Sequence, residues 1–403
     1  MRGAVGIKIR GVLGGIRPAW AGLPGELYYN VSSKSMGKRE LLLIIAFVIG
    51  GAIVYQATAP PPAAGERSFS PGRLLDDFRR HLRGNRASAE TTTVSHHAVG
   101  PAVAELKVAR AGELIIIGED RPDIEAELHV RSNGEDEAEA QRLAKETVLK
   151  VETAGSVLAA SVSYPEAGTQ RALRLTLKVP ARLLVTLEGG SPLNVTGVAG
   201  VELSSSRGEA RVRNITGKVT GTHRGGELLV TNCGSVKLTA MGTEVQLERI
   251  AGETTLNIRG GQLRASELAG PIEIDSEGAE IRLDKIEKAT GLVRIHSASA
   301  SVTVRGLATE ARIDARGTEV EVEADRAAPL AIYSEGGGSV EVTPAAGDYE
   351  LDAVSRNGSL TIPDDTLQVT TNGDEHRAAG AVHGGGPMIT IRSQQADITV
   401  RQR

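Results

Sequence analysis

The chain has 403 residues, of which 40% are hydrophobic and only 2% aromatic, and its 46 basic and 50 acidic residues give a net charge of −4. Forty-eight glycines accompany many small and β-branched residues, a composition typical of short strands and turns. The interspersed charges exclude the concentrated basic surface of a nucleic-acid-binding protein. The single cysteine, Cys233, excludes a disulfide within the chain and a multi-cysteine metal site.

An uncharged run from Leu41 to Ala57 follows three basic residues near the start of the chain. Its length is at the short end of the about 17 to 25 residues that cross a bilayer. The basic flank predicts a single-pass membrane protein with a cytoplasmic N-terminus and its bulk in the periplasm or outside the cell. A cleaved signal peptide is the alternative, because ATA at Ala57–Ala59 resembles a cleavage site, although Pro60 follows it directly.

Met36 opens a complete signal-anchor pattern, MGKRELLLIIAFVIGG. We therefore interpret residues 1–35 as an N-terminal extension from a misassigned start codon and residues 36–57 as the transmembrane signal anchor. Residues 58–100 are predicted to be a Pro-rich linker with a short amphipathic helix around Leu74–Leu82. The arginine-rich face of that helix fits either contact with anionic headgroups or simple solvation.

Residues 101–189 predict a β-rich cap region with one helix. Alternating residues in AELKVARAGELIIIGEDRPDIEAELHV predict two or three strands with tight turns at Gly112 and Gly118. Two further strands are expected in SVLAASVSYP and RALRLTLKVPARLLVTLEGG, the second interrupted at Pro180. One helical stripe in EDEAEAQRLAKETVLKVE contains Ala140, Leu143, Ala144, Thr147, Val148 and Val151.

Residues 190–403 contain two glycine series, half a period apart. The first series is Gly200, Gly217, Gly234, Gly252, Gly270 and Gly291. The second series is Gly208, Gly226, Gly242, Gly261, Gly278, Gly317, Gly338 and Gly358. A repeat of roughly 17 to 21 residues with two strands and two turns is typical of a solenoid. The predicted fold class is therefore all-β, a parallel β-solenoid (β-helix) of short two-strand coils.

Each predicted strand carries two apolar residues around one polar residue, and period-two alternation directs the apolar pair inward. The apolar pairs are Val236 and Leu238, Val245 and Leu247, Ile272 and Ile274, Ile281 and Leu283, Val320 and Val322, and Val340 and Val342. A single coil buries too little to stand alone, so coils must stack and the ends need caps. The helix near Arg142 and the strands before Pro180 are the expected N-terminal cap, and GGGPMITIRSQQADITVRQR is the expected last coil.

Motif searches favour a protein without catalytic activity, cofactor or metal. HGGGP at His383–Pro387 resembles an esterase oxyanion loop, but no G-x-S-x-G nucleophile motif accompanies it. His96 and His97 have no third ligand at metal spacing. The acidic stretches at Asp364–Asp365 and Asn372–His376 lack the calcium nonapeptide. Cys233 is interpreted as a small buried hydrophobe.

The order of anchor, linker, GELIIIGEDRPDIEAEL, helix, LRLTLKVPARLLVTLEGGSPLNVTGVAG and repeated G-x-V-x-V units resembles the bacterial β-strand-repeat adhesins with an autotransporter-adhesin-head type of domain. The resemblance covers about Val103 to Arg403. It implies an exported β-solenoid whose adhesive role is assigned by analogy.

The leading hypothesis is a non-enzymatic, membrane-anchored protein that interacts with an envelope polymer or a surface protein. One alternative is a polysaccharide-active enzyme on a β-helix. Only Tyr333 and Tyr349 are aromatic after Gly190, which leaves few rings on which sugars could stack. The other alternative is a self-assembling scaffold that resembles the bactofilins. The candidate binding face is the outward ladder of the second strand series, in the order Gln246, Arg264, Arg282, Thr303, Glu321, Glu341 and Thr361. Within it Arg264 and Arg282 form a basic part, and Glu321 and Glu341 form an acidic part.

Overall fold

The computed structural model describes residues 87–109, 112–165, 171–189, 192–362 and 367–402, all within one unit of the chain, Arg79–Arg403. The predicted extension 1–35, the anchor 36–57 and the helix around Leu74–Leu82 lie outside these residues. The described part consists of β-strands and one helix, which confirms the all-β class. No helix in this part is both long and apolar enough to cross a bilayer.

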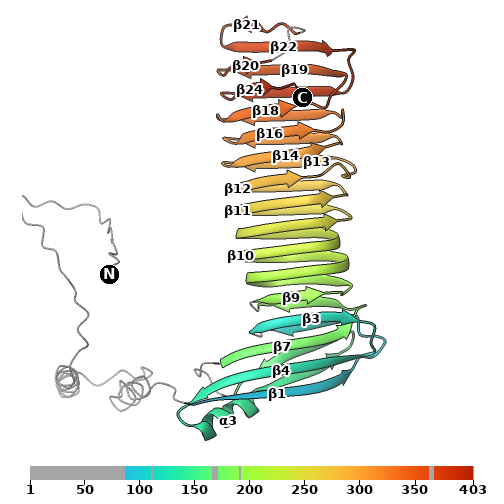
Figure 1. Ribbon diagram of the computed structural model, residues 1–403, viewed down its shortest axis with the longest axis vertical. Helices are drawn as coiled ribbons and strands as arrows, with labels where there is room; N and C mark the ends of the chain where they lie inside the picture. The colour runs from blue at the N-terminus through green and yellow to red at the C-terminus, as the bar shows by residue number, and fades with distance from the viewer. Residues whose placement is uncertain (1–86, 110–111, 166–170, 190–191, 363–366, 403) are drawn as a thin grey trace, which may run out of the picture. The chain divides into compact units, whose positions relative to one another are not determined.

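Most strands are stacked in parallel, and Figure 1 shows them one above another. Strand β11 (Thr254–Leu268) sets the pattern with β12 (Ile272–Asp284), because Thr254 pairs with Ile272 and Gly261 pairs with Ala279. Both pairings join residues 18 positions apart, the step that the glycine series predicts. We call the set of paired strands through Thr254–Arg259 ladder A and the set through Gly261–Ser266 ladder B.

The ladders bring strands together in an order that differs from their order in the chain at both ends. Ladder A runs β5 (Val148–Ala154), β6 (Val157–Ser163), β2 (Glu105–Ala109), β8 (Leu184–Glu188), β10 (Gly200–Ile250), β11, β12, β13 (Val293–Ala298), β15 (Ala311–Arg316), β17 (Leu330–Glu335), β23 (Met388–Gln394), β19 (Tyr349–Arg356), β22 (Glu375–Val382) and β21 (Thr370–Asn372). Ladder B runs β1 (Ala87–Ala98), β4 (Asp123–Gly134), β7 (Arg171–Pro180), β3 (Glu113–Glu119), β9 (Leu193–Thr196), β10, β11, β12, β14 (Ser301–Leu307), β16 (Glu319–Ala324), β18 (Ser339–Thr343), β24 (Asp397–Val400) and β20 (Leu360–Thr361).

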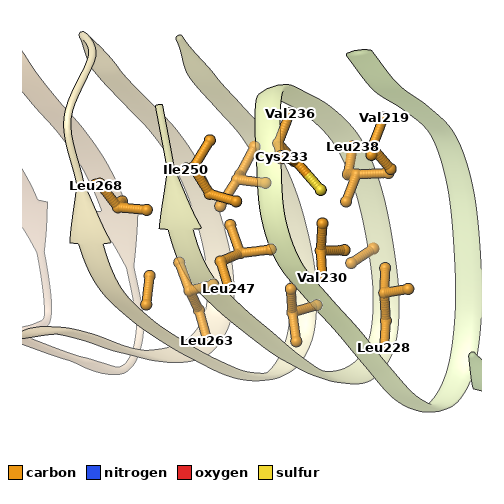
Figure 2. Close-up of a cluster of buried hydrophobic side chains, with 14 of the residues drawn as sticks. Val219, Leu228, Val230, Cys233, Val236, Leu238, Leu247, Ile250, Leu263 and Leu268 are labelled. Carbon is orange, nitrogen blue, oxygen red and sulfur yellow. The ribbon is translucent and has the colours of Figure 1, made fainter. Parts of the chain in front are cut away.

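The core is a narrow aliphatic column between the two ladders. All twelve side chains of the predicted inward pairs are buried, so the period-two alternation is confirmed. Figure 2 shows Leu228, Val230, Leu247 and Leu263 of ladder B on the opposite side of the core from Val219, Val236 and Leu238 of ladder A. The same figure places Cys233, Ile250 and Leu268 at the corner between the ladders. Because only the inward side chains of the two ladders and their corners fill this core, each coil depends on its neighbours for cover.

Helix α3 (Glu137–Glu146) lies at the N-terminal end of the stack and packs on β1 and β4 (Figure 1). The carboxylate of Asp136 accepts a hydrogen bond of 2.7 Å from the Glu139 backbone N–H and caps the first turn. The helical stripe predicted through Val151 is too long, because the helix ends at Glu146. The β-branched residues that follow favour the strand β5 instead.

Residues 87–98 correct the linker predicted at 58–100, because they form strand β1, which pairs antiparallel with β4 along its whole length. The sequence of β1, ASAETTTVSHHA, lacks the regular apolar alternation that predicts a strand. None of its described residues is buried, and the antiparallel pairing with β4 supplies the hydrogen bonds that hold it in place.

The C-terminal coil is last in the sequence but not last in the stack. Strand β23 lies between β17 and β19, and β24 lies between β18 and β20. This placement corrects the expected last coil. Asp352 of β19 joins the inserted strand to its neighbours: its backbone carbonyl accepts a hydrogen bond of 2.8 Å from Arg392, and its carboxylate is paired with Arg392 and lies 3.3 Å from Arg377 Nε. Antiparallel β22 then covers β19.

One glycine from each series illustrates two different steric demands. Gly252, in the first series, donates a hydrogen bond of 2.5 Å to the Gly234 carbonyl, and a Cβ there would lie 2.6 Å from that same oxygen. Gly242, in the second series, has φ +57° and open space around its missing Cβ. The first position therefore requires close approach between coils, and the second requires a left-handed backbone.

Substitutions at these two glycines should differ in their cost. Gly252→Ala forces two backbones apart and should lower the free energy of unfolding by an amount at the upper end of about 1–3 kcal/mol. Gly242→Asn should stay within about 1 kcal/mol of the wild type, because asparagine adopts the left-handed region readily. Urea unfolding of both variants measures the difference. A larger loss for Gly242→Asn than for Gly252→Ala would contradict this assignment.

Candidate functional site

A hollow of about 480 Å³ lies on the outer face of ladder A, across β11, β12, β13, β15 and β17. Two outward columns of side chains line it, each with one residue per strand. The first column is Asn257, Asp275, His296, Asp314 and Tyr333. The second column is Arg259, Glu277, Ala298, Arg316 and Glu335.

The hollow forms where one short side chain interrupts a column of long ones. Ala298 stands between Glu277 on one neighbouring strand and Arg316 on the other. The in-register parallel pairing places these three side chains side by side, about 4.8 Å apart from strand to strand. A methyl group in the middle position therefore leaves a space that the flanking side chains surround.

One half of the hollow is held by contacts among its own side chains. His296 Nδ1 lies 3.2 Å from Asp314 Oδ2, and Arg312 donates two hydrogen bonds of 3.0 and 3.2 Å to the same carboxylate. These hydrogen bonds raise the pKa of Arg312. The guanidinium carbon of Arg312 lies 4.9 Å from the centre of the Tyr333 ring. This contact fixes the position of an exposed aromatic side chain.

The other half of the hollow presents polar groups that have no partner among the described residues. Asn257, Arg259, Asp275 and Glu277 are exposed, and none of their side chains hydrogen-bonds or ion-pairs within the described ranges. An amide, a guanidinium and two carboxylates together offer both donors and acceptors to a ligand. The hollow can therefore bind a polar molecule without first breaking internal ion pairs.

The residues predicted as a binding face lie on ladder B in the predicted order as far as Glu341. Gln246, Arg264, Arg282, Thr303, Glu321 and Glu341 pair strand by strand along it. The predicted next member, Thr361, is displaced by one strand, because Thr399 of the inserted β24 lies between Glu341 and Thr361.

Each charged residue of that predicted face has an opposite charge beside it. The pairs are Arg264 with Glu244 at 2.8 Å, Arg282 with Asp284 at 2.7 Å, Glu321 with Arg305 at 2.9 Å, and Glu341 with Arg401 at 2.8 Å. The basic and acidic parts of the face are thus neutralised locally. Such pairs keep the surface soluble and contribute little net stability.

The ladder A hollow was not predicted, because the candidate binding face was chosen on the second strand series, which forms ladder B. One signal was present in the sequence: Tyr333 is one of two aromatic residues after Gly190, and it stands at an outward position of the first strand series. The other residue, Tyr349, is half-buried. The shape of the hollow depends on the small size of Ala298 relative to its neighbours on the two adjacent strands. This difference is visible only when neighbouring repeats are compared.

His223 is a buried polar residue in the core. Its Nδ1 lies within hydrogen-bonding distance of Ser206 Oγ, and its Nε2 lies 3.0 Å from the Gly208 carbonyl oxygen. The arrangement fits a neutral ring that donates from Nε2 and accepts at Nδ1. Burial lowers the pKa of His223. Because both side chains are enclosed, this serine–histidine pair supports the core and is closed to a substrate.

The remaining sequence candidates take part in local contacts. His96 lies 3.1 Å from Asp123, and His97 lies 3.0 Å from Ser95 Oγ. His383 contacts the Gly347 carbonyl at 3.3 Å in a corner of the chain. Asp364 and Asp365 lie outside the described residues. Among the residues that are described, no cluster of three histidine, cysteine or acidic side chains could hold a metal ion.

Cys233 is buried at the corner between the ladders (Figure 2). Burial raises the pKa of its thiol to about 11, so the thiol stays protonated and unreactive at neutral pH. The interpretation of Cys233 as a small core residue agrees with this position.

No family model and no curated protein matches the chain. Solved structures that are similar include a "putative cell adhesion protein" from Clostridium sporogenes, 8% identical over 78% of this chain and 100% of that chain, with a TM-score of 0.19. Another is a "putative lipid binding protein" from Parabacteroides distasonis, 9% identical over 77% of this chain and 97% of that chain, with a TM-score of 0.29. A "putative adhesin" from Bacteroides fragilis is 12% identical over 78% and 97%, with a TM-score of 0.25. At this level of identity and TM-score, the similarity does not assign a function to this chain.

The buried His223 should make stability depend on pH. Its pKa in the folded state lies below the unfolded value of about 6.5, so its contribution is complete above that value and is lost as the pH falls below it. Urea unfolding at pH 7.5 and 5.5 should show a loss of up to about 1.4 kcal/mol per pH unit. The loss should be smaller in His223→Gln and unchanged in His383→Asn, which alters an exposed histidine. An equal loss in His223→Gln would contradict the assignment.

Proposed function

We propose that this chain is an exported, non-enzymatic protein of the bacterial cell envelope that attaches to an envelope polymer or a surface protein. In this proposal Leu41–Ala57 anchors it in the membrane as a single span with the N-terminus in the cytoplasm. The described strands are the coils of a β-solenoid related to the β-strand-repeat adhesins. The regular 18-residue step of the parallel pairs supports the solenoid.

The observation that carries this proposal is the contrast between the two outer faces. On ladder B the charges of the predicted face are engaged in ion pairs at 2.7 to 2.9 Å. On ladder A four exposed polar side chains surround a hollow without partners among the described residues. Free polar groups around a concave surface favour a ligand site, so we assign attachment to ladder A and retain ladder B as the second candidate face.

The scaffold alternative conflicts with the ends of the stack. A polymer that resembles bactofilins requires parallel strands exposed at both ends for end-to-end pairing. Here antiparallel β22 covers β19 at one end of ladder A, and antiparallel β5 covers β6 at the other. Antiparallel β1 and β4 end ladder B at the N-terminal end, and at the other end only the two-residue parallel strand β20 is left for pairing. These caps favour a protein that displays its faces over one that polymerises through its ends.

Attachment without turnover is the direct test. The full chain, purified in detergent, should bind peptidoglycan or envelope polysaccharide saturably and release no reducing ends or other soluble fragments. Asp275→Ala with Glu277→Ala should weaken attachment at little cost in stability, because neither carboxylate has a partner among the described residues. Arg264→Ala with Arg282→Ala is the matched change on ladder B and should leave attachment largely intact. Fragment release would favour the enzyme alternative, and loss only with the ladder B change would move the site to that face.

Membrane topology can be tested separately. Protease added to spheroplasts should digest the region after Pro60 and spare a tag on the N-terminus, because the basic flank keeps that terminus in the cytoplasm. Lysed cells are the control, since the tag should be digested there. Digestion of the tag in intact spheroplasts would reverse the orientation. A mature chain that begins near Pro60 would show a cleaved signal peptide instead of an anchor.

A further inference from the structure

We propose that the ladder A hollow binds a short stretch of a neutral saccharide chain, about four units long at about 4.8 Å per strand, with Tyr333 as the stacking surface at one end. The inference rests on the proposed function and names the ligand class for the same site. Its central residues are Tyr333, Ala298 and the four exposed side chains without partners, which are Asn257, Arg259, Asp275 and Glu277.

The size and shape of the hollow suit a short stretch of a polysaccharide. Its volume of about 480 Å³ lies in the lower half of the about 300–1,000 Å³ that small-molecule sites occupy. It crosses five strands on an outer face of the stack and is open to solvent. An open groove of this kind can accept an internal unit of a long chain, whereas an enclosed pocket would accept only a free end or a small molecule.

The polar side chains match the groups that a sugar presents. Each hydroxyl group of a sugar both donates and accepts a hydrogen bond. Asp275 and Glu277 can accept from hydroxyl groups, Arg259 can donate to their oxygens, and Asn257 can do both. Because these side chains have no competing partner among the described residues, binding replaces water and breaks no ion pair of the protein.

Tyr333 supplies the apolar contact that sugar rings need. Tyr333 is 37% exposed, and the guanidinium carbon of Arg312 lies 4.9 Å from the ring centre, which holds the ring in position. The C–H groups on one face of a pyranose pack on an aromatic ring as other apolar groups do. In a chain that is only 2% aromatic, an exposed tyrosine in a hollow is the place where such packing can occur.

The charges around the hollow select against acidic polymers. Four carboxylates line it, from Asp275, Glu277, Asp314 and Glu335, against two arginines and one histidine. Of these, Asp314 and Glu335 already contact basic groups. The unpartnered set leaves two carboxylates and one guanidinium, so a polyanion meets net repulsion. A neutral saccharide loses nothing to this field.

The test measures binding of three defined tetrasaccharides, which are long enough to reach from β11 to β17, to the full chain in a detergent without a sugar headgroup, since maltoside detergents would compete. Cellotetraose and tetra-N-acetylchitotetraose are the neutral probes, and tetragalacturonic acid is the acidic probe. Calorimetry and saturation-transfer NMR should detect a neutral tetrasaccharide and no acidic one. Tyr333→Leu removes the ring, and Ala298→Gln fills the hollow. Each substitution should weaken binding about five- to tenfold.

Ala159→Gln is the matched control, because Ala159 is exposed on β6 of ladder A and does not line the hollow. It should leave binding unchanged, and circular dichroism should show that all three variants are folded. Failure of both neutral probes to bind, or binding that survives Tyr333→Leu and Ala298→Gln, would overturn the inference. If attachment to envelope polymer persists in that case, the proposed function stands and only the ligand class is wrong; if attachment is absent too, both fail.

Discussion

The in-register parallel pairing of equivalent residues is the constraint on which the rest of this structure depends. Thr254, Ile272 and Val293 pair in succession along ladder A, and Leu263, Ile281 and Val302 pair along ladder B. This register places like side chains over like, so the core becomes a column of aliphatic groups and the outer faces become columns of polar groups. A slip of one residue would exchange the two, which explains why glycine positions and apolar pairs recur together.

At each end of the stack, the outermost strand has no further coil with which to pair its backbone groups. At the N-terminal end the chain covers them with antiparallel strands and with α3, whose Ala140, Leu143 and Ala144 are buried. At the C-terminal end the final coil turns back and inserts before β19. The residues from β19 to β22 thereby form the outermost layer, and the paired Asp352 and Arg392 hold the inserted strand against it. Capping is thus achieved by changing strand order and direction and, at the N-terminal end, by adding α3.

The features that could be predicted from the sequence are those that are local and recur in every repeat. The alternation in each strand identified the buried pairs, and the glycine period gave the register of ladder B from Gln246 to Glu341, since each step depends only on neighbouring repeats. The sequence could not predict the insertion of β23. Its pairing with β17 joins segments some sixty residues apart, and β19 is nearer in the chain as a partner for β17. The end of α3 was misplaced because Val148 and Val151 fit both a helical stripe and a strand.

The candidate site belongs to a third category, since it arises from differences between repeats. A repeating face on which every charge is paired with an opposite charge leaves no charged group free for a ligand. The charged residues of the predicted face on ladder B are paired in this way. Specific recognition requires a break in the repeat, and Ala298 with Tyr333 supplies one on ladder A by combining a missing side chain with an exposed ring. The unpartnered side chains lie on β11 and β12, beside this break. In a stacked protein of this kind, the positions that depart from the repeat are therefore the ones that can carry function, while the repeat itself holds them at fixed spacing.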